Sequence, residues 1–185
     1  MRRTAIALAL LIVPVLALSG CTPTPPPAVT APKPSSTPLF ATEDEALKAA
    51  TEAYAAYLKV SDQITSEGGA NPERIAPLVT PSQLKRDLQT FHTYQAKGYF
   101  SRGVTGFSRL RIQSYSALSN SNEVVAYVCA DFTNIRLTDS RGVDITPTDL
   151  ESVSPLEVRF ASARSAPPKL LLDRSEQWTG KDFCS

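Results

Sequence analysis

Apolar residues after residue 42 recur at intervals of three and four, which predicts an amphipathic helix over about residues 43–64. The residues that form its apolar face are Leu47, Ala50, Tyr54, Tyr57 and Leu58. Thr42 precedes this run and Glu45 lies three residues later, which is the pattern of a capping box at a helix N-terminus. Gly68 and Gly69 end the pattern, so the helix is expected to stop before them.

Two further helix starts follow. Asn71 and Pro72 are typical of a helix cap and a first helical residue, and Pro77 keeps this second helix short. Thr80 is expected to cap a third helix, which Gly98 terminates. The apolar stripe of the third helix consists of Leu84, Leu88 and Phe91.

The pattern then changes to strands. Four strands are expected, at residues 104–115, 123–137, 156–161 and 169–178, with turns at 119–122, 138–142 and 166–168. The second strand is apolar on both faces, which indicates a central position in the sheet. Helices followed by antiparallel strands predict an α+β fold, in which the N-terminal helices pack on a curved four-stranded antiparallel sheet to form a cone.

The first 20 residues have the features of an export signal. Arg2 and Arg3 precede an apolar stretch, Ala5–Leu18, of 14 residues. A helix needs about 20 residues to span a bilayer. A charged start, a short apolar middle and small residues at the end predict a secretory signal peptide over residues 1–20.

The end of this segment, Leu18-Ser19-Gly20-Cys21, resembles the lipobox of bacterial lipoproteins. The resemblance implies that the Cys21 thiol receives a diacylglycerol group, with fatty chains such as palmitate, and becomes the first residue after cleavage. Two acyl chains anchor a protein stably. The sequence therefore predicts a lipid anchor in the cell membrane and a domain that faces outside the cytoplasm. The alternative is an ordinary signal peptide with a chance cysteine.

A linker separates Cys21 from the folded region. Seven of the 17 residues at 22–38 are proline, which favours polyproline II at about 3.1 Å per residue and a reach of roughly 50 Å. We interpret residues 21–38 as a lipidated spacer and residues 39–185 as one globular domain. A ligand for a proline-binding domain is the alternative interpretation of the linker.

Composition and charge disfavour some classes of function. Hydrophobic residues make up 42% of the chain and charged residues 20%, which is typical of a globular protein. Loss of Arg2 and Arg3 with the signal peptide would lower the net charge from +1 to −1. This balance does not favour nucleic-acid binding. It also offers no polybasic patch for anionic lipid, so membrane association depends on the covalent anchor.

The order of elements, the VCADF segment and the spacing W-x-x-x-x-x-C at Trp178–Cys184 resemble small lipoproteins of Gram-positive envelopes with a nuclear-transport-factor-2-like (cystatin-like) fold. An unrelated α+β sandwich is the alternative. Folds of this class often have a cavity between helices and sheet. Candidate residues for lining it are Tyr54, Tyr57, Phe91, Tyr127, Asp131 and Trp178, although aromatics at such spacing are also typical of a plain core.

Cys129 and Cys184 remain as a pair once Cys21 is lipidated, and in an exported domain such a pair predicts a disulfide. Two free thiols or a metal site are the alternatives. A metal site is disfavoured because His92 is the single histidine and no C-x-x-C spacing occurs. We expect no metal and no cofactor.

Asp131 and His92 are the two candidates for acid–base chemistry. Asp131 lies in mid-strand, where a buried carboxylate would have a raised pKa; pairing with Arg109 or Arg159, or an open face, is the plainer interpretation. His92 is either a general base or simply solvated.

No catalytic, phosphate-binding or calcium-binding motif occurs. The leading hypothesis is therefore a non-catalytic lipoprotein whose domain binds a small apolar ligand or an envelope protein partner. The rivals are a polyketide-cyclase-like enzyme that uses Asp131 with His92 or a tyrosine, and a structural protein of envelope assembly.

Overall fold

The computed structural model describes residues 39–115, 123–163 and 169–185, all within the compact unit Pro34–Ser185. The expectations for the signal peptide, Cys21, the linker and the turns at 119–122 and 166–168 lie outside these residues. The elements are α1 (Glu43–Ser66), the 3₁₀ helix η1 (Pro72–Leu78), α2 (Pro81–Lys97), β1 (Phe100–Arg102), β2 (Gly106–Tyr115), β3 (Glu123–Asp131), β4 (Arg136–Thr138), β5 (Val153–Ala163) and β6 (Lys169–Gln177).

The two long helices begin and end where the sequence predicts. Thr42 Oγ1 accepts a hydrogen bond from the Glu45 N–H at 3.2 Å, and the Glu45 carboxylate accepts one from the Ala41 N–H at 2.9 Å. Side-chain acceptors of this kind satisfy amides that the first helical turn leaves unpaired. Thr80 caps α2 in the same way, and Gly98 ends it in the left-handed conformation at φ 64°.

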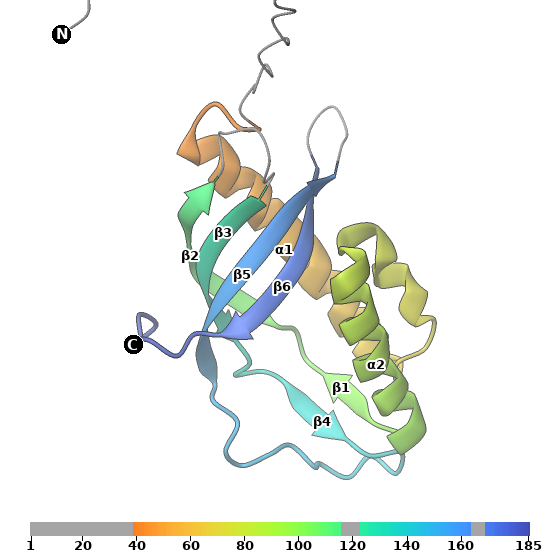
Figure 1. The fold of residues 1–185 in the computed structure, drawn as a ribbon. Coiled ribbons are helices and arrows are strands. Elements are labelled where there is room, and N and C mark those ends of the chain that lie inside the picture. The colour runs from red at the N-terminus through yellow and green to blue at the C-terminus, as the bar shows by residue number, and fades with distance from the viewer. Residues whose placement is uncertain (1–38, 116–122, 164–168) are drawn as a thin grey trace, which may run out of the picture. The chain divides into compact units, whose positions relative to one another are not determined.

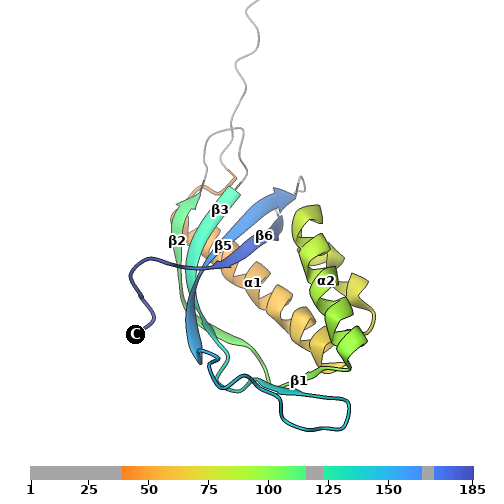
Figure 2. The ribbon, with the colours of Figure 1, turned by 60° about the horizontal axis from the view of Figure 1, so that its bottom comes forward.

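Four antiparallel strands in the order β2-β3-β5-β6 form the main sheet, which curves around α1 (Figures 1 and 2). This confirms the predicted α+β class and the central position of β3. α1 lies against the concave face, and α2 lies beside it near β6 (Figure 2). The core is an apolar layer between α1 and the sheet. Its largest fully buried side chains include Tyr54, Ile64, Val128, Phe160 and Leu172.

The strand predicted over residues 123–137 is wrong in its C-terminal part, because β3 ends at Asp131. There the Asp131 Oδ1 accepts a hydrogen bond from the Thr133 N–H at 2.9 Å, and the Ile135 N–H donates to the Phe132 carbonyl at 2.9 Å. Asp side chains promote such turns. After the turn, β4 pairs with β1, a strand that the sequence did not reveal, to form a separate two-stranded sheet.

The described helices of residues 39–185 are all too short or too polar to cross a membrane.

Candidate functional site

A cavity of about 380 Å³ lies where α1 and α2 meet the two-stranded sheet. The helices supply most of its polar lining, and the segment from Phe132 to Leu150 supplies apolar side chains. The residues from the helices that matter most below are Tyr57, Ser61, Asp62, Asp87, Thr90, Phe91 and Tyr94. The apolar residues of the other wall are Phe132, Ile135, Leu137, Pro147 and Leu150.

The wall opposite the helices is held by its own hydrogen bonds. The Leu137 N–H donates to Thr146 Oγ1 at 2.8 Å, and the Ile145 N–H donates to the Leu137 carbonyl at 2.8 Å. Asp139 accepts hydrogen bonds from two backbone amides of the turn that follows β4. Figure 1 shows this segment running from β4 to β5 below the main sheet. Its apolar residues therefore form a fixed wall.

Asp87 is the most unusual residue of the cavity. Its side chain is buried, with 6% of the residue exposed. Its Oδ1 accepts hydrogen bonds from Gln83 Nε2 at 2.8 Å and from the Tyr57 hydroxyl at 3.2 Å. Its Oδ2 has no hydrogen-bond partner among the described residues. Buried polar atoms nearly always have partners, so an unpartnered carboxylate oxygen on a residue that lines a cavity marks a candidate binding site.

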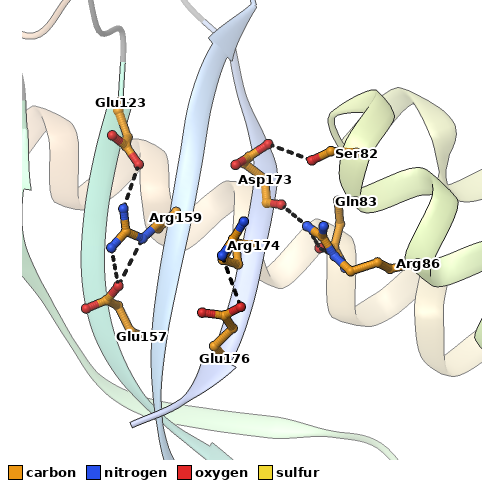
Figure 3. Close-up of polar contacts among 9 residues, drawn as sticks. All are labelled: Ser82, Gln83, Arg86, Glu123, Glu157, Arg159, Asp173, Arg174 and Glu176. Atoms are coloured by element: carbon orange, nitrogen blue, oxygen red, sulfur yellow. Dashed lines mark hydrogen bonds and ion pairs between the residues drawn. The ribbon is translucent and has the colours of Figure 1, made fainter.

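Within the described residues, no cation forms an ion pair with Asp87. The nearby Arg86 donates instead to Gln83 Oε1 and to the Asp173 carbonyl (Figure 3). Burial raises the pKa of Asp87, while hydrogen bonds from Gln83 and Tyr57 and the charge of Arg86 oppose the rise.

The N-terminus of α2 is fixed to β6, which determines where Asp87 lies. A register shift in β6 places Asp173 between Leu172 and Arg174 without a partner on β5. Asp173 Oδ1 accepts a hydrogen bond from Thr80 Oγ1 at 2.6 Å and one from Ser82 Oγ at 3.2 Å; Figure 3 shows the second of these. This attachment turns the face of α2 that carries Asp87 toward α1.

The other ionisable groups of the cavity are engaged differently. Asp62 accepts hydrogen bonds from the Thr105 N–H at 2.8 Å and from Thr105 Oγ1 at 2.7 Å, so its carboxylate holds the chain just before β2. Burial, reinforced by Asp87, raises the pKa of Tyr57, and burial raises that of Tyr94. Both phenols are therefore neutral hydroxyl groups at physiological pH.

The predicted pocket residues do not all lie together. Tyr57 and Phe91 line the cavity. Tyr54 lies in the core, where its ring meets that of Phe107 edge to face at 5.1 Å, and burial raises its pKa to about 12. Tyr127 and Trp178 lie against each other, at 4.8 Å between ring centroids, and line a separate hollow on the opposite face of the sheet.

The structure distinguishes the alternatives given for Asp131 and His92 and speaks against the catalytic one for each. Asp131 is neither buried with a raised pKa nor paired with Arg109 or Arg159. Its hydrogen bonds from Thr133 lower its pKa. His92 is exposed on α2. Neither residue lines the cavity, so the geometry does not support an acid–base pair formed by the two.

The cysteine prediction is confirmed. Cys129 of β3 and Cys184 of the C-terminal tail form a disulfide. Among the described residues, no three His, Cys, Asp or Glu side chains are arranged to hold a metal ion.

Sequence reasoning missed Asp87, although a signal was present. Gln83, Asp87 and Phe91 are spaced by four residues and therefore share one helical face. Two polar residues in line with a buried phenylalanine indicate a polar site on an inward-facing surface.

The comparisons with known proteins add nothing to these observations. No protein-family model matches the chain, and the search of curated proteins returned no match.

The raised pKa of Asp87 predicts how stability depends on pH. The unfolded carboxyl ionises near its ordinary pKa of about 3.9. The folded one ionises only at higher pH. Between the two pKa values the unfolded chain binds fewer protons, so the free energy of unfolding falls as the pH rises through this interval.

Asp87→Asn removes this contribution. From acidic to neutral pH, we therefore expect the free energy of unfolding of the variant to rise by about 1 kcal/mol relative to that of the wild type. This is the scale of the cost of an unsatisfied buried polar group. Urea unfolding of both proteins from pH 4 to pH 8 measures this difference. Two stability curves that stay parallel over the whole range would contradict the burial argument.

Proposed function

We propose that this protein is a lipid-anchored, extracytoplasmic binding protein whose cavity holds a small, mainly apolar molecule that carries a hydrogen-bond donor. The observation that carries the proposal is that Asp87, which lines a cavity with apolar walls, has a buried Oδ2 for which the described part of the chain supplies no hydrogen-bond partner. Pockets for small molecules typically combine such walls with a few polar groups that fix the orientation of the ligand.

The walls define the body of the ligand. Phe91 and Phe132 contribute rings, and Ile135, Leu137 and Leu150 contribute aliphatic side chains. Burial of apolar surface gains about 25 cal/mol per Å². A hydrocarbon or aromatic body is therefore favoured over a polar one. A concave site of this kind also favours a small molecule over the protein partner that the sequence left open.

Asp87 defines the polar end of the ligand. A buried carboxylate accepts hydrogen bonds, and a charged or neutral N–H or O–H group of the ligand would satisfy the Oδ2. Tyr57 already donates to Oδ1, which leaves the other oxygen for the ligand. A ligand that presents its own carboxylate would meet repulsion, so the site favours amines and alcohols over acids.

The anchor is the second part of the proposal. The lipobox-like residues Leu18–Cys21 and the proline-rich linker support a domain that is held away from the membrane by a lipidated cysteine. The nuclear-transport-factor-2-like resemblance is supported by the helices on the concave face of a curved sheet. A cavity on such a tether suits capture of a ligand close to the cell surface.

A blocking substitution tests the cavity. The fluorescent probe N-phenyl-1-naphthylamine is apolar and carries one N–H donor, and we expect it to bind to a lipid-free chain of residues 22–185. Thr90 lines the cavity and is exposed, so Thr90→Trp is expected to fill the entrance without unfolding α2 and to weaken binding at least tenfold. A fluorescence titration measures the affinity.

Thr93→Trp is the matched control, because Thr93 is also exposed on α2 but does not line the cavity. The control is expected to bind the probe like the wild type. Equal affinities for all three proteins, or no binding by any of them, would count against the proposed site.

A further inference from the structure

The opposite face of the sheet carries a second concave site that does not depend on the cavity. It has a volume of about 290 Å³, and its lining combines three aromatic and three cationic side chains. The residues are Arg109, Arg111, Tyr127, Trp178, Lys181 and Phe183. No acidic residue is among them.

The C-terminal tail is held on this face by several independent contacts. The disulfide joins Cys184 to β3, and Arg109 Nη1 donates to the Phe183 carbonyl at 2.9 Å. The Trp178 indole N–H donates to the Lys181 carbonyl at 3.1 Å. A Cβ at Gly180 would lie 2.5 Å from the Trp178 ring, so only glycine permits this close approach. Figure 2 shows the tail leaving β6 and crossing the sheet on the side away from α1.

A bulge in β2 brings the arginines to this site. The register of β2 on β3 shifts between Ser108 and Arg111, and Arg109 within the shift has φ 52°, in the left-handed region. Such a conformation is unfavourable for a residue with a Cβ and is often kept where function needs it. The bulge aims Arg109 at the tail, while Arg111 stands next to Tyr127 in the register.

The rings form the body of the site. The Tyr127 ring lies 4.8 Å from Trp178 and 5.6 Å from Phe183, measured between centroids. Tilted neighbouring rings of this kind present flat apolar surface at an angle, which suits the face of a ring-shaped ligand.

The nearby acids leave the cations available. Glu157 pairs with Arg159 at 2.8 Å, and Glu176 pairs with Arg174 at 3.2 Å (Figure 3). Asp182 accepts a hydrogen bond from the Cys184 N–H in its own loop. Arg111 and Lys181 have no hydrogen-bond or ion-pair partner within residues 39–115, 123–163 and 169–185. Among these residues, therefore, no acid neutralises the positive charges of the two side chains.

We infer that this hollow binds a small ligand in which an anionic group is attached to a ring. The ring lies against Trp178, Tyr127 and Phe183, and the anion accepts hydrogen bonds from Arg111 and Lys181. Charge-assisted hydrogen bonds to arginine are the stronger kind. An acidic sugar and an aromatic acid share this chemistry.

The single tryptophan gives a direct assay. The full chain in neutral detergent micelles shows one indole N–H signal in a nitrogen–proton correlation spectrum, and that signal belongs to Trp178. Four probes distinguish the contribution of the ring to binding from that of the charge. Glucuronate and benzoate carry both, glucose carries only a ring, and acetate carries only the charge. We expect a saturable shift with at least one of the two ring acids and none with glucose or acetate. The ring acid that shifts the signal, glucuronate or benzoate, identifies the ligand class as an acidic sugar or an aromatic acid.

Substitutions of Arg111 and Lys181 test whether these cations bind the anionic group of the probe. Arg111→Gln is expected to weaken binding of the active probe about tenfold, and Lys181→Gln is expected to weaken it as well. Arg174→Gln is the control, because Arg174 lies on the same face but outside the hollow and is paired with Glu176. The position of the unliganded indole signal shows that each variant keeps the tail in place. The inference is overturned if neither ring acid gives a saturable shift, or if Arg111→Gln binds like the wild type.

Discussion

Cys21→Ala is expected to remove the protein from the membrane fraction of its native cells and to abolish incorporation of a fatty-acid label. The thiol is the proposed attachment point, and each CH₂ group that enters the bilayer contributes about 0.8 kcal/mol. Two acyl chains hold a protein stably, whereas one chain binds only marginally. Fractionation and labelling with an alkyne analogue of palmitate measure both effects.

Cys184→Ala is a matched control for this experiment. It also removes one thiol but leaves the lipobox-like residues intact. The control is expected to stay in the membrane fraction and to carry the label. Labelling of the Cys21→Ala protein would contradict the lipoprotein proposal.

Loss of the disulfide is expected to have the largest effect on stability. The bond joins residues that are 55 positions apart, so it limits the freedom of a long loop in the unfolded chain. The chain-entropy model assigns about 4 kcal/mol to a loop of this size. The double variant Cys129→Ala/Cys184→Ala is expected to unfold at correspondingly lower urea concentration when followed by circular dichroism.

The fluorescence of Trp178 distinguishes release of the tail from unfolding of the whole domain in the double variant. This residue is the single tryptophan and lies where the tail begins, so its fluorescence reports release of the tail. In the double variant the tryptophan signal is expected to change at lower urea than the helical signal. A double variant as stable as the wild type would show that the tail contributes nothing to the fold.

The two long helices, the α+β class and the central position of β3 followed from local signals, whereas the small sheet of β1 and β4 did not. Thr42 and Thr80 form their caps within a few residues of sequence, and Gly98 ends α2 without help from distant parts of the chain. The sequence of helices and strands then restricts the fold, because antiparallel neighbours and a single apolar helix face leave few arrangements. The disulfide prediction followed from the two cysteines that remain when Cys21 is set aside as the predicted lipidation site.

The placement of the aromatic residues did not follow from the sequence. β3 is apolar on both faces, so alternation alone does not say whether Tyr127 or Val128 points toward α1. A shift of one position moves a side chain to the other face of the sheet. In the structure Val128 enters the core, and Tyr127 faces the tail beside Trp178.

The site residue Asp87 was missed for a different reason. A lone acid on an amphipathic helix is typical of a solvent-facing position, and the only local sign against this is that Asp87 shares a helical face with Phe91. Its burial depends on contacts between Thr80, Ser82 and Asp173, which lie about ninety residues apart in the chain. These long-range contacts cannot be read from the sequence around Asp87.

The most direct test of the proposed function compares octylamine with octanoate as competitors for the cavity. The measured quantity is the displacement of bound N-phenyl-1-naphthylamine at neutral pH. Both competitors have an eight-carbon chain and differ in the charged group that would meet Asp87. We predict that octylamine displaces the probe at least tenfold more effectively than octanoate, and that Asp87→Asn abolishes this preference while it leaves the probe bound. Equal displacement by the two competitors in the wild-type protein would contradict the assignment of Asp87 as the polar anchor of the ligand.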